Sequence, residues 1–232
     1  MNYSLLSPEI ITALLGLLVL AAALALPRKG QSVAGPLTIL GALLAAGYII
    51  VHFNLQGKLF GGVYQVDQYA NAFKLLFLTA LVLVLLMSGD YVDKFGNTRS
   101  EWYSFMIFAV LGMMVMASAG DLITLYIGME LMTISFYILA AYLYNDAFSA
   151  EAGIKYLIMG ALSSGVLLFG MSLVYAGSGS TVFTEIYQGL AGYPGIEPLV
   201  LSGIILVLVG LAFKISLVPF HMWTPDVYMG AP

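Results

Sequence analysis

Long apolar stretches, repeated along most of the chain, limit the possible folds of this sequence more than any other feature. A helix needs about 20 predominantly apolar residues to cross the hydrocarbon core of a bilayer. Turn-forming residues such as glycine, proline, asparagine and aspartate separate the stretches. We therefore expect an all-α polytopic membrane protein with about seven transmembrane helices, and a short surface helix at 181–190. The seven stretches are roughly 8–26, 34–54, 69–89, 101–118, 121–143, 151–176 and 198–229.

Composition supports this class and excludes several others. Of the 232 residues, 61% are hydrophobic and 9% are charged, whereas an average soluble domain has about 25% charged residues. The chain has no cysteine and two histidines, which excludes thiolate metal sites and disulfides and disfavours a metal centre. No glycine-rich nucleotide motif is present. We expect the chain itself to bind no NAD, FMN, ATP or nucleic acid, and its partners to include the lipid bilayer.

Basic residues in the short connections predict the orientation in the membrane. Arg28 and Lys29 follow the first stretch and Lys94 and Arg99 follow the third, whereas the opposite side has Lys58 alone. Lysine and arginine favour the cytoplasmic side. The N-terminus is thus predicted outside, with an uncleaved first helix, because the first residues lack the basic region of a signal peptide. A bacterial cell membrane is the expected location, and an organelle would place the basic loops in the matrix or stroma.

Two charged residues in the fifth and sixth stretches are candidates for ion transport. Glu130 lies about ten residues into its stretch, or ~15 Å along the helix, near the membrane midplane. An ionisable group at this depth costs about 2.5–3.5 kcal/mol on insertion scales and is interpreted by default as functional. Lys155 lies nearer a helix end. It could snorkel to the interface, pair with Glu151 four residues earlier, or belong to the same ion path.

Lys214 occurs deep in the last stretch, shortly before Pro219 and His221. Proline lacks an N–H and clashes with the carbonyl four residues earlier, so the seventh helix should break near Lys214–Pro219. Broken helices at membrane depth require burial in protein or a wet cavity, and they mark ion sites in transporters. His221 could relay protons or cap the opened backbone. The alternative is that the helix ends near residue 215 and Lys214 reaches the interface.

A glutamate and a lysine in apolar surroundings can form a proton switch. Burial lowers the pKa of a lysine and raises that of a glutamate, and pairing opposes both shifts. Separating the pair therefore favours release of a proton from the lysine. We interpret two other charges as structural: Asp121 as a helix N-cap with Thr124 three residues on, and Lys74 as a snorkelling residue.

Three segments closely resemble one known family, the antiporter-like subunit N of respiratory complex I, the proton-translocating NADH:quinone oxidoreductase. They are GMELMTISFYILAAY (128–142), EAGIKYLIMGALSSG (151–165) and FKISLVPFHMWTPDVYMGAP (213–232). The resemblance implies that Glu130, Lys155, Lys214 and His221 form a proton path. It also implies other membrane subunits as partners, which in the complex are associated with NADH, FMN, iron–sulfur clusters and a quinone outside this chain.

The resemblance further implies the first half of an inverted-repeat fold. Residues 1–100 would form an N-terminal three-helix segment, and residues 101–232 the first antiporter-like repeat, truncated before helix eight. The sequence departs from the family at Met229, where a glutamate is usual. We also expect the chain to be a fragment, because the family continues for roughly as long again. Two other functions remain open: an Mrp-like cation/proton antiporter subunit and a purely structural membrane spacer.

Overall fold

The computed structural model describes residues 3–25, 33–92, 99–191 and 197–232, except for the side chains of Asp90 and Arg99. Its α-helices, in chain order, are α1 (Ser7–Ala25), α2 (Ala34–Val51), α3 (Gln68–Val92), α4 (Arg99–Ala117), α5 (Leu122–Ala140), α6 (Ala147–Ser178), α7 (Phe183–Ala191), α8 (Pro198–Lys214) and α9 (Trp223–Gly230). Within these described ranges, six helices, α1 to α6, are long and apolar enough to span a membrane, and α8 is a shorter apolar helix. The predicted all-α polytopic fold is therefore confirmed, including the break in the last stretch.

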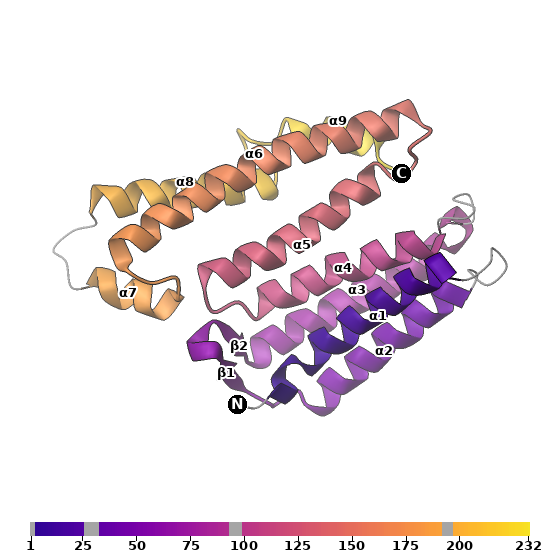
Figure 1. The fold of residues 1–232 in the computed structure, drawn as a ribbon, viewed down its shortest axis with the longest axis horizontal. Helices are drawn as coiled ribbons and strands as arrows, with labels where there is room; N and C mark the ends of the chain where they lie inside the picture. Colours follow the sequence, from indigo (N-terminus) through magenta and orange to yellow (C-terminus); the bar gives the residue numbers. More distant parts are fainter. Residues whose placement is uncertain (1–2, 26–32, 93–98, 192–196) are drawn as a thin grey trace. The chain divides into compact units, whose positions relative to one another are not determined.

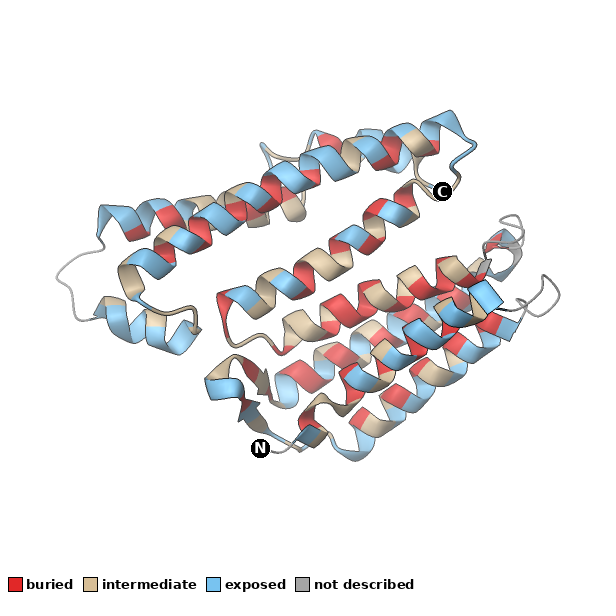
Figure 2. Cartoon of the chain, viewed as in Figure 1, coloured by how far each residue is buried: buried red, intermediate tan, exposed pale blue. Residues whose placement is uncertain are grey.

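The helices bury narrow stripes and leave broad apolar surfaces exposed (Figure 2). In α6, for example, glycine, serine and alanine occupy most of the buried positions, while most of the leucine, isoleucine and phenylalanine side chains face outward. A soluble protein would place its large apolar residues inside. Only a surrounding apolar phase makes the reverse distribution favourable, and in membranes small residues let helices approach closely.

The chain forms two compact units. Unit 1 comprises Met1–Ala119 and Ile127–Phe136, and unit 2 comprises Gly120–Tyr126 and Tyr137–Pro232. In unit 1, α1 packs against α2 and α4, and α3 also packs against both α2 and α4, so that the four helices form a bundle (Figure 1). Close approach of α4 and the central part of α5 depends on two glycines. A Cβ on Gly112 would lie 2.5 Å from the carbonyl oxygen of Gly128.

A small hairpin covers one end of the unit 1 bundle. After a 3-10 turn at Tyr3–Leu6 that leads into α1, the chain between α2 and α3 forms antiparallel strands β1 (Gly57–Leu59) and β2 (Tyr64–Val66), joined by a 3-10 turn at Phe60–Gly62. Gln65 N donates to Ser118 O at 2.8 Å, which ties the hairpin to the end of α4. Sequence analysis predicted only a loop here. Strands of three residues are too short for an alternating pattern to be recognised.

Unit 2 consists mainly of α6 with the two halves of the broken last stretch. Helix α8 packs along one part of α6, and α9 packs along another part (Figure 1). The predicted N-cap at the start of α5 is confirmed, since Asp121 Oδ1 accepts from Thr124 N at 2.9 Å. The second Asp121 oxygen accepts from the hydroxyl of Thr181 at 3.1 Å, which fixes the connection before α7. Helix α7 confirms the short helix predicted near 181–190.

Candidate functional site

The break after α8 follows directly from the local sequence. Helix α8 ends at Lys214, the backbone turns through Ser216 with φ of 55°, and α9 begins at Trp223. A break leaves carbonyl groups of the last turn without their helical donors. Phe213 O accepts from Ser216 N at 3.0 Å and also from the indole Nε1 of Trp223 at 3.1 Å. The predicted fracture near Lys214–Pro219 is thus confirmed, and its backbone is closed by a buried tryptophan.

Lys214 points toward two hydroxyl groups on neighbouring helices. Its Nζ donates to Ser164 Oγ of α6 at 2.8 Å and to Tyr137 Oη of α5 at 3.3 Å. The ammonium also lies 5.9 Å from the centre of the Tyr137 ring, within the range of a cation–π contact. Lys214 is only partly exposed, while Ser164 and Tyr137 are buried. Helix α8 ends at Lys214, as the alternative also expected, and the side chain contacts α5 and α6.

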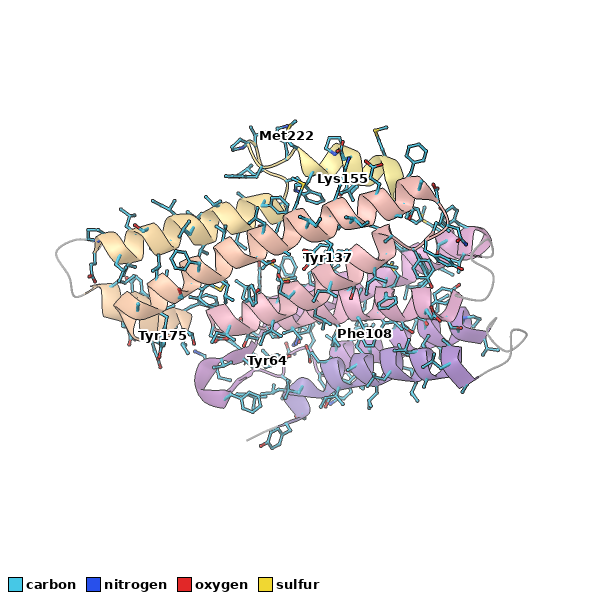
Figure 3. The ribbon with its side chains drawn as sticks, turned by 45° about the horizontal axis from the view of Figure 1, so that its top comes forward. Tyr64, Phe108, Tyr137, Lys155, Tyr175 and Met222 are labelled. Atoms are coloured by element: carbon cyan, nitrogen blue, oxygen red, sulfur yellow. The ribbon has the colours of Figure 1, made fainter. Side chains whose placement is uncertain are left out.

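Aromatic rings hold this lysine site in place. Tyr137 meets Tyr156 edge to face at 4.6 Å, and Tyr156 stacks on Trp223 at 4.7 Å. Trp223 in turn stacks on Phe213 at 5.4 Å. The row of four rings therefore runs from the lysine partner Tyr137 (labelled in Figure 3), past the start of α9, to the end of α8. Each such pair contributes about 0.5–1.5 kcal/mol beyond area burial, so the site and the break are stabilised by the same side chains.

Glycine and serine residues of α6 allow this packing. Ser163 Oγ donates to Gly210 O of α8 at 3.2 Å, next to the Ser164 hydroxyl that accepts from Lys214. A Cβ added at Gly160 would lie 2.6 Å from Tyr137 Cζ, and it would lie closer still to Tyr137 Oη. The missing side chain at this position is therefore what lets the tyrosine hydroxyl reach the site. Sequence analysis missed Tyr137, Ser163 and Ser164, although the pair of serines in an otherwise apolar helix was a usable signal.

Lys155 lies in a different setting from Lys214. Its Nζ is 2.8 Å from Glu151 Oε1 and 2.8 Å from Asp226 Oδ2, and its side chain is 40% exposed. The predicted pairing with Glu151 is confirmed. Asp226 was not predicted, and it joins the first half of α6 to α9 (Figure 3 labels Lys155). The structure thus brings Lys155 into contact with the second half of the broken stretch rather than into the Lys214 cluster.

The two remaining predicted path residues lie on α5 and in the break. Glu130 is half-buried in the part of α5 that belongs to unit 1, and its backbone carbonyl accepts from Thr133 Oγ1 at 3.4 Å. Its pairing with the lysines stays a prediction. His221 is half-buried between α8 and α9, and its Nδ1 is a buried atom with no hydrogen-bond partner among the described residues. Its relay role stays a prediction too.

One sequence prediction is wrong. Lys74 was expected to snorkel, but its side chain is completely buried and its Nζ lies 2.7 Å from Glu9 Oε1. The partner is 65 positions earlier in the sequence, so no local spacing indicated the pair. Within the described ranges, no three His, Asp or Glu side chains converge in a way that could hold a metal ion. Arg28, Lys29 and Lys94, which carry most of the orientation argument, lie outside the described residues.

Fold and site together define a class: a polytopic membrane protein in which a lysine ends a broken helix and contacts hydroxyl groups on two neighbouring helices. Residues 119–232 match the family described as NADH:quinone oxidoreductase/Mrp antiporter, TM. Residues 119–232 belong to this family.

Relatives and solved structures agree with this assignment. The chain is 48% identical over 231 residues to the NADH-quinone oxidoreductase subunit N of Desulforamulus reducens, with 100% of this chain and 48% of that protein covered. It is 48% identical over 237 residues to the subunit N of Moorella thermoacetica, again covering 100% and 48%. The chain therefore spans about half the length of the curated relatives it matches.

A chain of respiratory complex I from Thermus thermophilus superimposes with a TM-score of 0.78 at 32% identity, covering 97% of this chain and 48% of that one. The archaeal membrane-bound sulfane sulfur reductase has a chain with the same fold, with a TM-score of 0.75 at 24% identity, covering 98% of this chain and 47% of that one.

Proposed function

We propose that this chain is part of a membrane-arm subunit of a proton-translocating NADH:quinone oxidoreductase. In this proposal it moves protons across the membrane through Glu130, Lys155, Lys214 and His221, driven by quinone reduction in other subunits. NADH, FMN, iron–sulfur clusters and the quinone are bound by those subunits and not by this chain. The names of the relatives support the assignment to this complex over the Mrp-like antiporter, since the matches along the whole chain carry the subunit N name.

The observation that carries the proposal is the Lys214 cluster. Lys214 is the last residue of α8, where the backbone carbonyl groups carry a partial negative charge. Two hydroxyl groups within hydrogen-bond distance can each accept one proton and donate another. In this proposal the two hydroxyl groups pass a proton to or from the lysine.

The orientation and the division of the chain belong to the same proposal. The excess of basic residues in the connections after α1 and α3 favours an N-terminus outside a bacterial cell membrane. The exposed Lys58 on strand β1 would then lie on the outer side. Residues 1–100 would be an N-terminal segment and residues 101–232 the first antiporter-like repeat, which is supported by the family match beginning at residue 119.

The test uses the assembled complex containing the full-length subunit. Lys214→Ala and Glu130→Ala should lower proton translocation in vesicles, measured as acidification during quinone reduction. Lys58→Ala, which removes an exposed lysine, serves as the matched control and should behave like wild type. Unchanged translocation in both Lys214→Ala and Glu130→Ala would remove the proposal. Purification without flavin and iron–sulfur subunits, but with cation/proton exchange intact, would instead assign the chain to an Mrp-like antiporter.

A further inference from the structure

A second buried charge cluster lies in unit 1, outside the residues that match the family. Glu9 of α1, Lys74 of α3 and Tyr64 of strand β2 come together there (Figure 3 labels Tyr64). Lys74 Nζ is 2.7 Å from Glu9 Oε1 and donates to Tyr64 Oη at 3.2 Å. The exposed fraction of the side chain is 0% for Lys74 and 7% for Glu9. We name these three residues the Glu9–Lys74 cluster.

The charges in this cluster can be assigned. Burial, and next the negative charge of Glu9, raise the pKa of Tyr64 far above its ordinary value, so the phenol stays neutral. The positive charge of Lys74 is therefore balanced by the Glu9 carboxylate. Glu9 is in the first turn of α1, where the helix dipole also favours a negative charge. The resting cluster is a neutral ion pair beside a neutral hydroxyl.

The cluster lies close to one end of the bundle, beneath the hairpin. Glu9 is the third residue of α1 and Lys74 the seventh of α3, which places them about 3 Å and 9 Å from the helix starts. Asp67, the nearest other acid along the chain, is engaged in capping α3 by accepting from Ala70 N at 2.7 Å. The Glu9 carboxylate also forms a side-chain hydrogen bond with Tyr64, so the phenol contacts both charged partners. A hydroxyl both accepts and donates, and it can therefore pass a proton between its neighbours.

We propose that the Glu9–Lys74 cluster is a second proton-exchange site of this chain. A proton from water forms an O–H bond with Glu9 Oε2 and neutralises the carboxylate. The Lys74 ammonium then lacks its counter-charge, so an N–H bond breaks as its proton passes to Tyr64 Oη, and the phenol O–H bond breaks as Tyr64 gives its own proton to water. Transfer of the Glu9 proton to the neutral Lys74 amine restores the ion pair. One proton enters and one leaves in each cycle, without any redox step. This inference rests on the proposed function.

A purely structural ion pair is the competing explanation, and the physics of buried pairs separates the two. Removing one partner leaves a buried charge and is strongly destabilising, whereas replacing both partners by neutral residues of similar size is often tolerated. The double variant Glu9→Gln/Lys74→Met therefore keeps the packing but cannot exchange protons. Lys74→Arg keeps the charge pair, but arginine does not release its proton in proteins.

The experiment measures translocated protons per quinone reduced, in vesicles with the assembled complex and the full-length subunit. Both the double variant and Lys74→Arg should assemble, and their ratio should fall to that of Lys214→Ala measured in parallel. A wild-type ratio in either assembled variant overturns the inference. If neither variant assembles, the pair serves folding alone and the inference is likewise overturned. Lys214→Ala keeps the two proposals distinguishable. If this variant translocated as many protons per quinone as wild type, the proposed function itself would be removed.

Discussion

The substitution Gly160→Ala tests the geometry of the Lys214 site without removing any polar group. A Cβ at this position would lie 2.6 Å from Tyr137 Cζ, whereas ordinary contact begins at 3.4 Å. Tyr137 Cζ must therefore move by about 0.8 Å, the difference between these two distances, and the hydroxyl oxygen, which lies nearer to the added Cβ, must move further. The ring is buried and packed edge to face on Tyr156, so it cannot simply rotate away. Overpacking of this kind costs about 1–3 kcal/mol.

The shift should also weaken the contact with Lys214. The distance from Nζ to Tyr137 Oη is already 3.3 Å, near the limit for a hydrogen bond, and a movement of this size away from the lysine would break it. Misplacement by about 1 Å can reduce a step that depends on alignment by ~100-fold. We expect Gly160→Ala to reduce proton translocation as much as Tyr137→Phe, which removes only the hydroxyl.

The matched control is Gly165→Ala on the same helix. Nothing lies within 4 Å of a Cβ added there, and alanine gains up to about 1 kcal/mol over glycine in a helix. Acidification in vesicles and the thermal stability of the purified complex are the two readouts. If Gly160→Ala translocated protons like Gly165→Ala at equal stability, Tyr137 would not belong to the path, and our account of why α6 has a glycine there would be refuted.

Three further substitutions test the elements that hold the site. Trp223→Phe keeps an aromatic ring but removes one of the two donors to Phe213 O, and losing this hydrogen bond should cost about 0.5–1.5 kcal/mol in the stability of the complex, measured by thermal unfolding. Asp121→Ala removes the N-cap of α5 and should lower the free energy of unfolding in detergent by about 0.5–2 kcal/mol. Asp226→Asn weakens a partly exposed ion pair with Lys155, and its effect in the same unfolding assay should stay below about 1 kcal/mol.

The elements that could be predicted from the sequence depend on local chemistry. Apolar length defined the spans, and Pro219 identified the break, because a proline acts on its own turn of helix. The N-cap at Asp121 is equally local, since its partners are two and three residues ahead. In each case the residues that cause the feature lie within one turn of it, so that reading along the chain is sufficient.

The features that could not be predicted depend on residues distant in the sequence. Glu9 is in a first helical turn, where an acid is common for reasons of the helix dipole alone, and nothing near it indicated Lys74. Asp226 lies within the predicted stretch 198–229 and was not singled out, yet it reaches Lys155, which is 71 positions earlier. Such pairs arise only when helices pack, and a single sequence contains no signal for which faces will meet.

Contacts between residues distant in the sequence also explain why Lys155 and Lys214, both embedded in apolar sequence, have different surroundings. Lys155 has acidic partners on its own helix and on α9, which favour a fixed positive charge. Lys214 donates to hydroxyl groups, which can relay a proton without adding charge. In the proposed proton path, Lys155 would supply a fixed charge and Lys214 would exchange a proton with the two hydroxyl groups. The connection between them through Tyr137, Tyr156 and the start of α9 means that movement of α9 would change both surroundings together.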